Sequence, residues 1–202
     1  MPVDHDERRR RIAEVTAAVI AHEGLDAATI RRIAAELGGP TKIITYYFAE
    51  KQELLHFTWQ HIAQQYSDQV AALAPTDIIG RLMAMAVADE AGVTRWRVYA
   101  AFWDRAARDP VFADLQRRHI ALALEQIAEM ARALGVAPDQ VERVSLLLNA
   151  TVQGISVQAL ADGELWSAER IRAALTDQVE MLLGRRLPPV SSLPAGRADN
   201  RA

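Results

Sequence analysis

Apolar residues recur at helical spacing along most of the chain. Between residues 6 and 24, one helical face carries Ile12, Val15, Val19 and Ile20, and Gly24 follows where a helix commonly ends. The sequence contains no clear run that alternates between apolar and polar residues, as half-buried strands do. The pattern therefore predicts an all-α fold.

The same spacing, together with glycine, proline and capping residues, divides the chain into about nine helices. After the first helix we expect short helices at 29–37 and 40–48, then longer ones at 50–74, 77–91, 94–108, 110–135, 138–161 and 167–184. Gly92 would end the helix at 77–91, and Thr94 would open the next. Residues 188–202 are rich in proline, serine and polar residues and cannot bury an apolar face, so we expect a disordered tail there.

The two short helices and the turn between them form a distinct unit. Thr29 can cap the first, Gly38 and Gly39 break the chain, and the second carries Ile44 and Phe48 four residues apart on one side. Two short helices joined by a glycine turn are typical of a helix-turn-helix, whose second helix enters the major groove of DNA. The alternative is a tight helical corner with no role in nucleic-acid binding.

The polar and aromatic side chains of the second short helix fit the first of these interpretations. Thr41, Lys42 and Thr45 face away from the apolar side and could reach bases. Tyr46 and Tyr47 have amphipathic rings that can pack beneath the helix while their hydroxyl groups reach phosphates.

The stretch TIRRIAAELGGPTKIITYYFAEKQELL, residues 29–55, resembles the signature of the TetR family of transcriptional regulators. It departs from that signature at Gly39-Pro40 and at Lys42, so the sequence predicts no operator. The resemblance implies that bases are contacted by Arg31, Thr41, Lys42 and Thr45. It implies that the DNA backbone is contacted by Thr29, Tyr46, Tyr47 and Lys51.

The resemblance also implies a division of the chain. Residues 1–49 would form a three-helix DNA-binding domain, and residues 50–187 a helical domain for ligand binding and dimerisation. The arginine run at residues 8–11 could be an N-terminal arm that follows DNA, or simply the solvated start of a helix.

Charge does not by itself favour DNA binding. The chain has 23 basic and 26 acidic residues, a net charge of −3, and acidic residues slightly outnumber basic ones in the first 55 residues. DNA binding would therefore depend on where the basic side chains lie. The charged N-terminus lacks the apolar core of a signal peptide, and no uninterrupted apolar run is long enough for a membrane span, so we expect a cytoplasmic protein without a membrane partner.

A candidate ligand site lies in the second half of the chain. Trp96, Tyr99 and Trp103 are spaced to share a helix face, and Asp104 is adjacent. The segment WRVYAAFWDRAARDPVFADLQRRH and the KIITYYF form of the recognition helix resemble the choline-responsive BetI branch of the family. That resemblance implies an aromatic cage for a small cation such as a quaternary amine. The alternative is that these aromatic side chains only pack in the hydrophobic core.

Two later features need partners. Asn149 and Gln153 lie four residues apart in an otherwise apolar helix and require hydrogen-bond partners, from a ligand or from a second subunit. The helix at 139–161 is apolar around most of its circumference, and the last helix is also amphipathic. The resemblance implies a homodimer through these two helices, reading a pseudopalindromic operator.

Enzyme function finds little support in the sequence. The one metal-like pattern, Glu53 to His56, is a single E-x-x-H, and di-iron helical bundles use this motif in pairs. The chain has no cysteine and no nucleotide-binding or hydrolase motif. We expect no catalytic residue, metal site or cofactor, and predict a repressor released from DNA by a small-molecule effector. The alternative is a helical protein-binding adaptor without DNA affinity.

Overall fold

The computed structural model describes residues 5–187, and the tail expected at 188–202 lies outside them. Within this range the chain forms nine α-helices and one 3₁₀ turn and contains no strand, so the predicted all-α fold is confirmed. The helices are α1 (His5–Glu23), α2 (Ile30–Glu36), α3 (Lys42–Thr45), α4 (Lys51–Ala71), α5 (Ile78–Met85), α6 (Glu90–Ala106), α7 (Pro110–Ala133), α8 (Val141–Ala161) and α9 (Ala168–Leu183), with the 3₁₀ turn at Pro138–Gln140.

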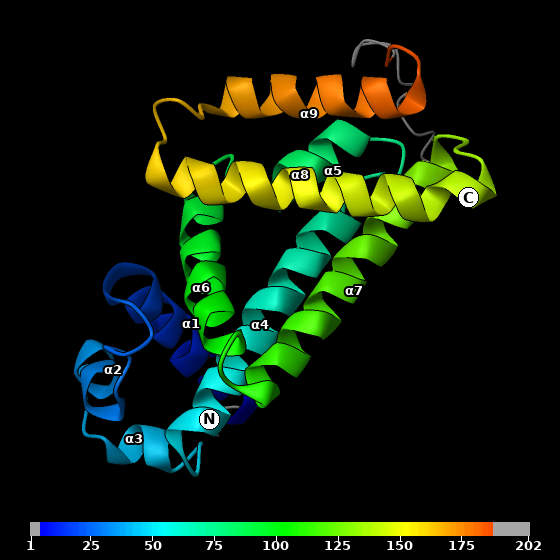
Figure 1. Ribbon diagram of the computed structural model, residues 1–202. Helices are drawn as coiled ribbons and strands as arrows, with labels where there is room; N and C mark the ends of the chain where they lie inside the picture. Colours follow the sequence, from blue (N-terminus) through cyan, green and yellow to red (C-terminus); the bar gives the residue numbers. More distant parts are fainter. Residues whose placement is uncertain (1–4, 188–202) are drawn as a thin grey trace, which may run out of the picture.

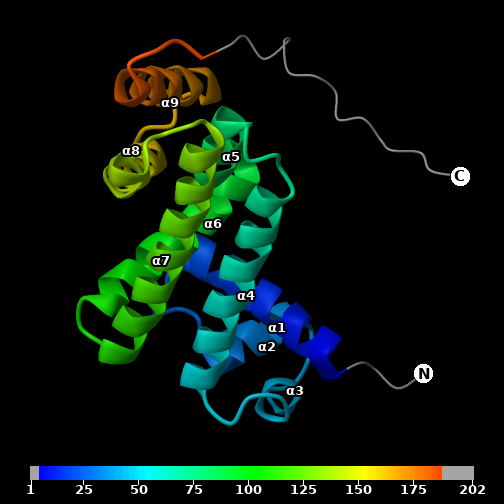
Figure 2. The same cartoon turned by 90° about the vertical axis from the view of Figure 1, so that its right-hand side faces the viewer.

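The helices are arranged in two parts that share α1 (Figures 1 and 2). Helices α1 to α3 gather at one end of the molecule, α4, α6 and α7 run along its length, and α8 and α9 lie across the other end. Helix α1 packs against α2 within the first part and against α4 and α6 of the second. A movement of α4 or α6 would therefore change the position of α1 directly.

The boundary between α5 and α6 differs from the sequence prediction. Helix α5 ends at Met85, and Ala86 is extended, so the prediction that the helix continues to Gly92 was wrong. Helix α6 begins at Glu90 because the Asp89 side chain caps it, accepting a hydrogen bond of 2.6 Å from the Gly92 amide. A Cβ atom on Gly92 would lie 2.9 Å from the Ala86 carbonyl oxygen, so this glycine permits a close approach inside a helix and does not end one.

Aromatic rings form much of the core between α4, α6 and α7. Trp59 and Tyr66 come from α4, Tyr99 and Phe102 from α6, and His119 from α7. The ring centroids of Tyr99 and His119 are 4.7 Å apart, and those of Trp59 and Tyr99 are 4.9 Å apart in an edge-to-face arrangement. Tyr99 and Trp96, two members of the aromatic stripe on α6, are both buried.

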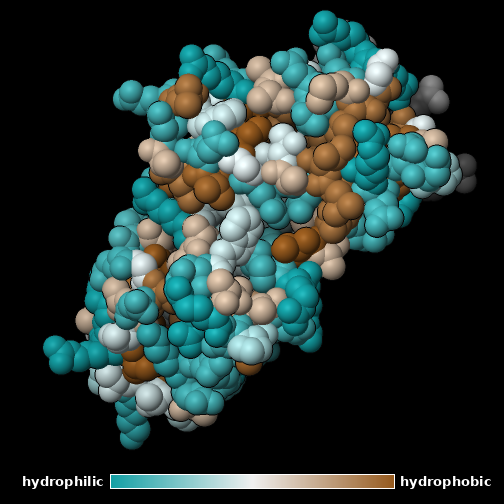
Figure 3. All heavy atoms as spheres, viewed as in Figure 1, coloured by the Kyte–Doolittle hydropathy of each residue, from teal (hydrophilic) through white to brown (hydrophobic). Residues whose placement is uncertain are grey.

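Helices α8 and α9 leave apolar side chains exposed. The outward residues on α8 include Leu146 and Val157, and Met181 on α9 is 69% exposed. Figure 3 shows hydrophobic residues gathered in the upper part of this face, where α8 and α9 lie. Among residues 5–187, Pro138–Ala161 is the one helical span that is long and apolar enough to cross a membrane, judged by length and composition alone. Of its most apolar stretch, 39% is buried within the protein.

His119 is a buried titratable group within the aromatic core. Burial, reinforced by the positive charge of Arg95, lowers the pKa of its imidazole to about 4. In the unfolded chain the imidazole has its ordinary pKa near 6.5 and binds a proton first as the pH falls. The neutral imidazole therefore contributes stability that is complete above pH 6.5 and is lost as the pH falls toward 4.

We expect the free energy of unfolding to fall by about 2 kcal/mol between pH 7.5 and pH 5 on account of His119 alone. Urea unfolding of the wild type and of His119→Gln at both pH values measures the contribution of His119 to the pH dependence of stability, because the variant lacks the titrating group. An equal pH dependence in the two proteins would show that His119 is readily protonated in the native state.

Candidate nucleic-acid interface and ligand cavity

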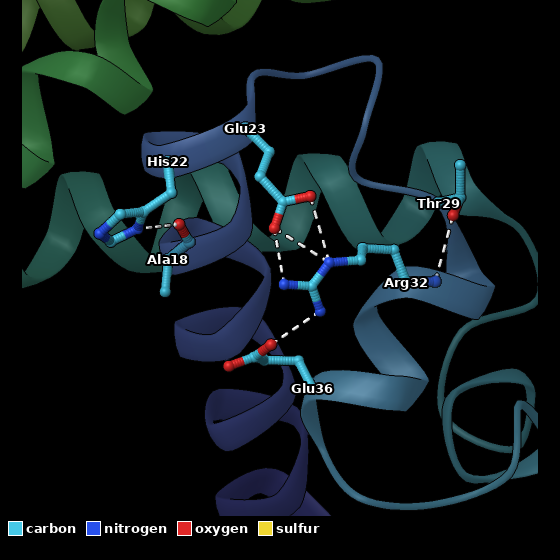
Figure 4. Close-up of polar contacts among 6 residues, drawn as sticks. All are labelled: Ala18, His22, Glu23, Thr29, Arg32 and Glu36. Carbon is cyan, nitrogen blue, oxygen red and sulfur yellow. Dashed lines mark hydrogen bonds and ion pairs between the residues drawn. The ribbon is translucent and has the colours of Figure 1, made fainter.

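Helix α2 is fixed at its start by a side-chain cap. The Oγ1 atom of Thr29 accepts a hydrogen bond of 3.1 Å from the Arg32 amide, as Figure 4 shows. Ile33 and Ala34 are buried on the inner side of the helix, whereas Arg31 is exposed. The structure therefore places Thr29 and Arg31 at the surface, where the sequence expected DNA contacts.

Arg32 ties α2 to the end of α1. Its Nη2 and Nε atoms lie 2.6 and 2.9 Å from Oε1 of Glu23, and its Nη1 atom lies 2.7 Å from Oε2 of Glu36 (Figure 4). The hydrogen bonds from Arg32 lower the pKa of the Glu23 carboxyl group. These side chains are partly exposed, so their contribution is chiefly orientation of α2 on α1.

The turn between α2 and α3 depends on two glycines. Gly38 has a φ of +69°, in the left-handed region that favours glycine. A Cβ atom on Gly39 would lie 2.3 Å from the Cδ1 atom of Ile43. Gly38 therefore supplies the left-handed residue of the turn, and Gly39 leaves room for the end of the Ile43 side chain.

Helix α3 separates a buried side from an exposed one. Ile44 and the following Phe48 are fully buried. Exposed residues on and beside the helix are Thr41, Lys42, Thr45 and Tyr46, and Tyr46 is 73% exposed. The structure thus brings these predicted site residues together on one surface beside Tyr47 and Lys51, both half-buried.

The tyrosine pair forms a small aromatic cluster with the start of α1. The centroids of Tyr46 and Tyr47 are 4.9 Å apart with their rings edge to face, and the Tyr47 ring lies 4.8 Å from that of His5. Ring packing of this kind restricts the tyrosine side chains and gives their hydroxyl groups a defined place on the surface.

Arg9 anchors the end of α3, a role that sequence reasoning missed. Its Nη1 atom donates to the Tyr47 carbonyl oxygen at 3.0 Å, and its Nη2 atom donates to Oε1 of Glu53 at 3.0 Å. The guanidinium carbon lies 4.4 Å from the Phe48 ring centroid and 4.7 Å from that of Phe57. One member of the arginine run therefore points inward and joins α1 to α3 and α4.

Glu53 completes this anchor. Its Oε2 atom accepts a hydrogen bond of 2.8 Å from the Ala49 amide, and Oε1 accepts from Arg9. The Ala49 amide, together with Arg9, lowers the pKa of the Glu53 carboxyl group. The E-x-x-H pattern at this position therefore reflects a structural carboxylate, and residues 5–187 hold no cluster of three metal-ligating side chains.

A small cavity lies in the second part of the molecule. Its volume is about 20 Å³, comparable to the space that one water molecule needs. The lining contains all five residues that the sequence singled out as ligand contacts: Trp96, Tyr99, Trp103, Asn149 and Gln153. Further lining residues are Tyr66, Met85, His119, Ala123 and Val152.

Several polar groups around the cavity have no protein partner. Among residues 5–187, no protein group pairs with the Tyr99 hydroxyl, the Trp103 indole nitrogen or Nδ1 of His119, although all three atoms are buried. Gln153 donates a long hydrogen bond of 3.4 Å to Asn149. Buried polar groups without partners are costly, so the cavity is suited to a ligand that supplies the missing hydrogen bonds.

Asp104 does not belong to this cavity. Its carboxylate pairs with Arg108, which lies just beyond the end of α6, and both side chains are exposed. Consecutive residues of an α-helix point about 100° apart, so Asp104 lies at the exposed surface although it follows Trp103.

Comparison with known proteins agrees with this arrangement. Residues 12–56 match the model of bacterial regulatory proteins of the tetR family, and residues 79–184 match the C-terminal domain of BetI-type transcriptional repressors. The chain is 28% identical to the HTH-type transcriptional regulator BetI of Vibrio atlanticus over 193 residues, covering 88% of this chain and 92% of the relative.

Two solved structures share the fold. A transcriptional regulator from Rhodococcus sp. Rha1 superposes with a TM-score of 0.79 at 24% identity, covering 90% of this chain and 99% of that one. A regulator from Saccharomonospora viridis, in complex with choline, has a TM-score of 0.73 at 24% identity, covering 87% and 96%. The family resemblance is confirmed: the chain belongs to the TetR family of transcriptional regulators, which are DNA-binding proteins and not enzymes.

Proposed function

We propose that this regulator is a repressor that holds a pseudopalindromic operator until a small-molecule effector enters the aromatic cavity. The observation that carries the proposal is the exposed polar surface of α3, held in place by buried Ile44 and Phe48. A rigid base with an exposed polar face is what a recognition helix requires, because base contacts depend on accurate placement in the groove.

The proposed DNA contacts follow from exposure and chemistry. Arg31, Thr41, Lys42 and Thr45 would reach base edges, since all four are exposed and carry hydrogen-bonding groups. Backbone contacts are assigned to Thr29, Tyr46, Tyr47 and Lys51. The DNA-binding domain would comprise residues 1–49 and the effector and dimerisation domain residues 50–187.

We further propose that the protein is a cytoplasmic homodimer formed through α8 and α9. The exposed apolar residues on these two helices, among them Leu146, Val157 and Met181, need a partner surface, and a second copy offers a self-complementary one. Twofold symmetry would then present two α3 helices to two operator half-sites.

Effector binding would act by expanding the cavity. A volume of about 20 Å³ is far smaller than pockets for organic ligands, which span roughly 300–1,000 Å³. Entry of an effector would therefore displace cavity helices, including α4 and α6, against which α1 packs. The DNA-bound and released states would differ in effector affinity, as regulation requires.

Replacement of Lys42 and Tyr47 by alanine should abolish specific DNA binding and leave the oligomeric state unchanged. Fluorescence anisotropy with labelled fragments flanking the protein's own gene, in the presence of nonspecific competitor, measures the affinity. Specific binding by the wild type should weaken steeply with added salt because phosphate contacts release counterions.

The control for this experiment is Arg172→Ala, which removes an exposed positive charge from α9. We expect wild-type affinity from this variant. Equal affinity of the double variant and the wild type would mean that α3 is not the recognition helix, and absence of any salt-sensitive selective complex would favour a protein-binding adaptor.

A double replacement Val157→Glu and Met181→Glu should convert the dimer to monomers, because it places four charges in the symmetric interface. Sedimentation velocity at micromolar concentration gives the oligomeric state. The matched control is Leu122→Glu, a similarly exposed leucine on α7, which should remain dimeric. A dimeric double variant would place the interface elsewhere.

A further inference from the structure

The walls of the cavity contain no negative charge. The lining residues are aromatic, apolar, amide or imidazole, with no aspartate or glutamate among them. Asp104, the carboxylate nearest in sequence to the aromatic stripe, is engaged by Arg108 at the surface. A cationic effector would therefore enter without a counter-charge from the lining.

A positive charge already lies beside the cavity. The Arg95 guanidinium carbon is 5.2 Å from the ring centroid of Tyr66, one of the lining residues. Its Nη2 atom is held by the carbonyl oxygens of Ala84 and Ala86 at 2.8 and 3.2 Å. Arg95 thus occupies a ring face of Tyr66 as an internal cation.

The remaining ring faces are largely used by other rings. Trp96 contacts Tyr99 edge to face at a centroid distance of 5.8 Å, and Trp103 at 5.9 Å. Tyr99 is packed in addition against Trp59 and His119. An aromatic cage for a quaternary ammonium group needs open ring faces, and few are open in this arrangement.

The unpartnered polar atoms around the cavity are mainly donors. The Tyr99 hydroxyl and the Trp103 indole N–H are buried on lining residues, and the Nε atom of Arg95 is buried beside them, with no acceptor in residues 5–187. Burial raises the pKa of Tyr99, so its hydroxyl group keeps its proton and remains a donor. These donors call for a ligand with acceptor oxygens.

We propose that the effector is a small organic anion, such as an aromatic carboxylate, and not a quaternary ammonium compound. This inference rests on the proposed effector site at the cavity. The carboxylate would accept hydrogen bonds from Tyr99 and Trp103 and be attracted by Arg95, while its apolar part would pack against the rings.

Three probes of similar size separate the charge classes: benzoate, benzamide and benzyltrimethylammonium, with choline as a fourth. Because Trp96 and Trp103 line the cavity, binding to the full chain should change tryptophan fluorescence saturably, measured at constant ionic strength. We expect benzoate to bind about tenfold more tightly than benzamide and the two cations to bind more weakly still. Equal binding of all probes, a preference for either cation, or no saturable change with benzoate at 10 mM overturns the proposal.

Variants of Arg95 test the origin of the preference. Arg95→Met should remove the preference for benzoate, lowering its affinity about tenfold, whereas Arg95→Lys should retain it. The control is Arg105→Met on the same helix, since Arg105 also lies over a ring, that of Phe112, but pairs with Asp109 outside the cavity. If Arg95→Met does not fold, the ranking in the wild type and in Arg95→Lys still decides.

Operator binding without any ligand separates this inference from the proposed function. A cation preference together with selective operator binding would overturn the anionic effector and leave the repressor standing. A benzoate preference together with no operator binding would support the anion site and remove the repressor.

Discussion

The recognition helix is too short to support itself, and this constraint governs the first part of the molecule. Helix α3 has four residues, whereas isolated helices need roughly 12–15 residues to be even marginally stable in water. Its position is therefore set by tertiary contacts: Ile44 and Phe48 are buried beneath it, and Arg9 binds the carbonyl of Tyr47 just beyond its end. Glu53 fixes both Arg9 and the Ala49 amide, so one carboxylate orders the connection from α3 to α4.

In the proposed mechanism, the same anchor connects the DNA-binding surface to the effector cavity. Arg9 lies on α1, which packs against α4 and α6, and these two helices contribute Tyr66 and Tyr99 to the cavity wall. Expansion of a cavity of about 20 Å³ by an organic molecule must move neighbouring helices, because protein interiors are close-packed. In that proposed mechanism, α1 would connect the cavity helices to α3 through Arg9.

Patterns among residues close together in the sequence predicted most of the helices. They did not predict contacts between segments far apart in the chain. The glycine turn, the Thr29 cap and the alternation of Ile44 and Phe48 with exposed residues are all readable within a few positions of sequence. The contacts of Arg9 with Tyr47 and Glu53 span 38 and 44 residues, so the arginine run gave no sign of them. The predicted helix end at Gly92 was wrong because the sequence does not distinguish a glycine that permits close packing from one that ends a helix. The aromatic stripe at the cavity was found from helical spacing. The positions of Asp104 at the surface and of Arg95 beside Tyr66 were not, because the direction of each side chain depends on packing.

Glu53→Ala tests whether the anchor formed by Arg9 and Glu53, and not charge alone, gives α3 its affinity for DNA. Removing an acidic group from a DNA-binding surface should strengthen binding if charge dominates. If the anchor positions α3, operator affinity should instead fall about tenfold, with an unchanged salt dependence, because α3 loses its fixed position. Glu50→Ala is the matched control because it removes the same charge three residues earlier in the chain. The Glu50 side chain is exposed and makes no capping hydrogen bond. We expect weaker operator binding by Glu53→Ala and unchanged or tighter binding by Glu50→Ala. Tighter binding by both variants would show that charge, and not the anchor, sets the affinity.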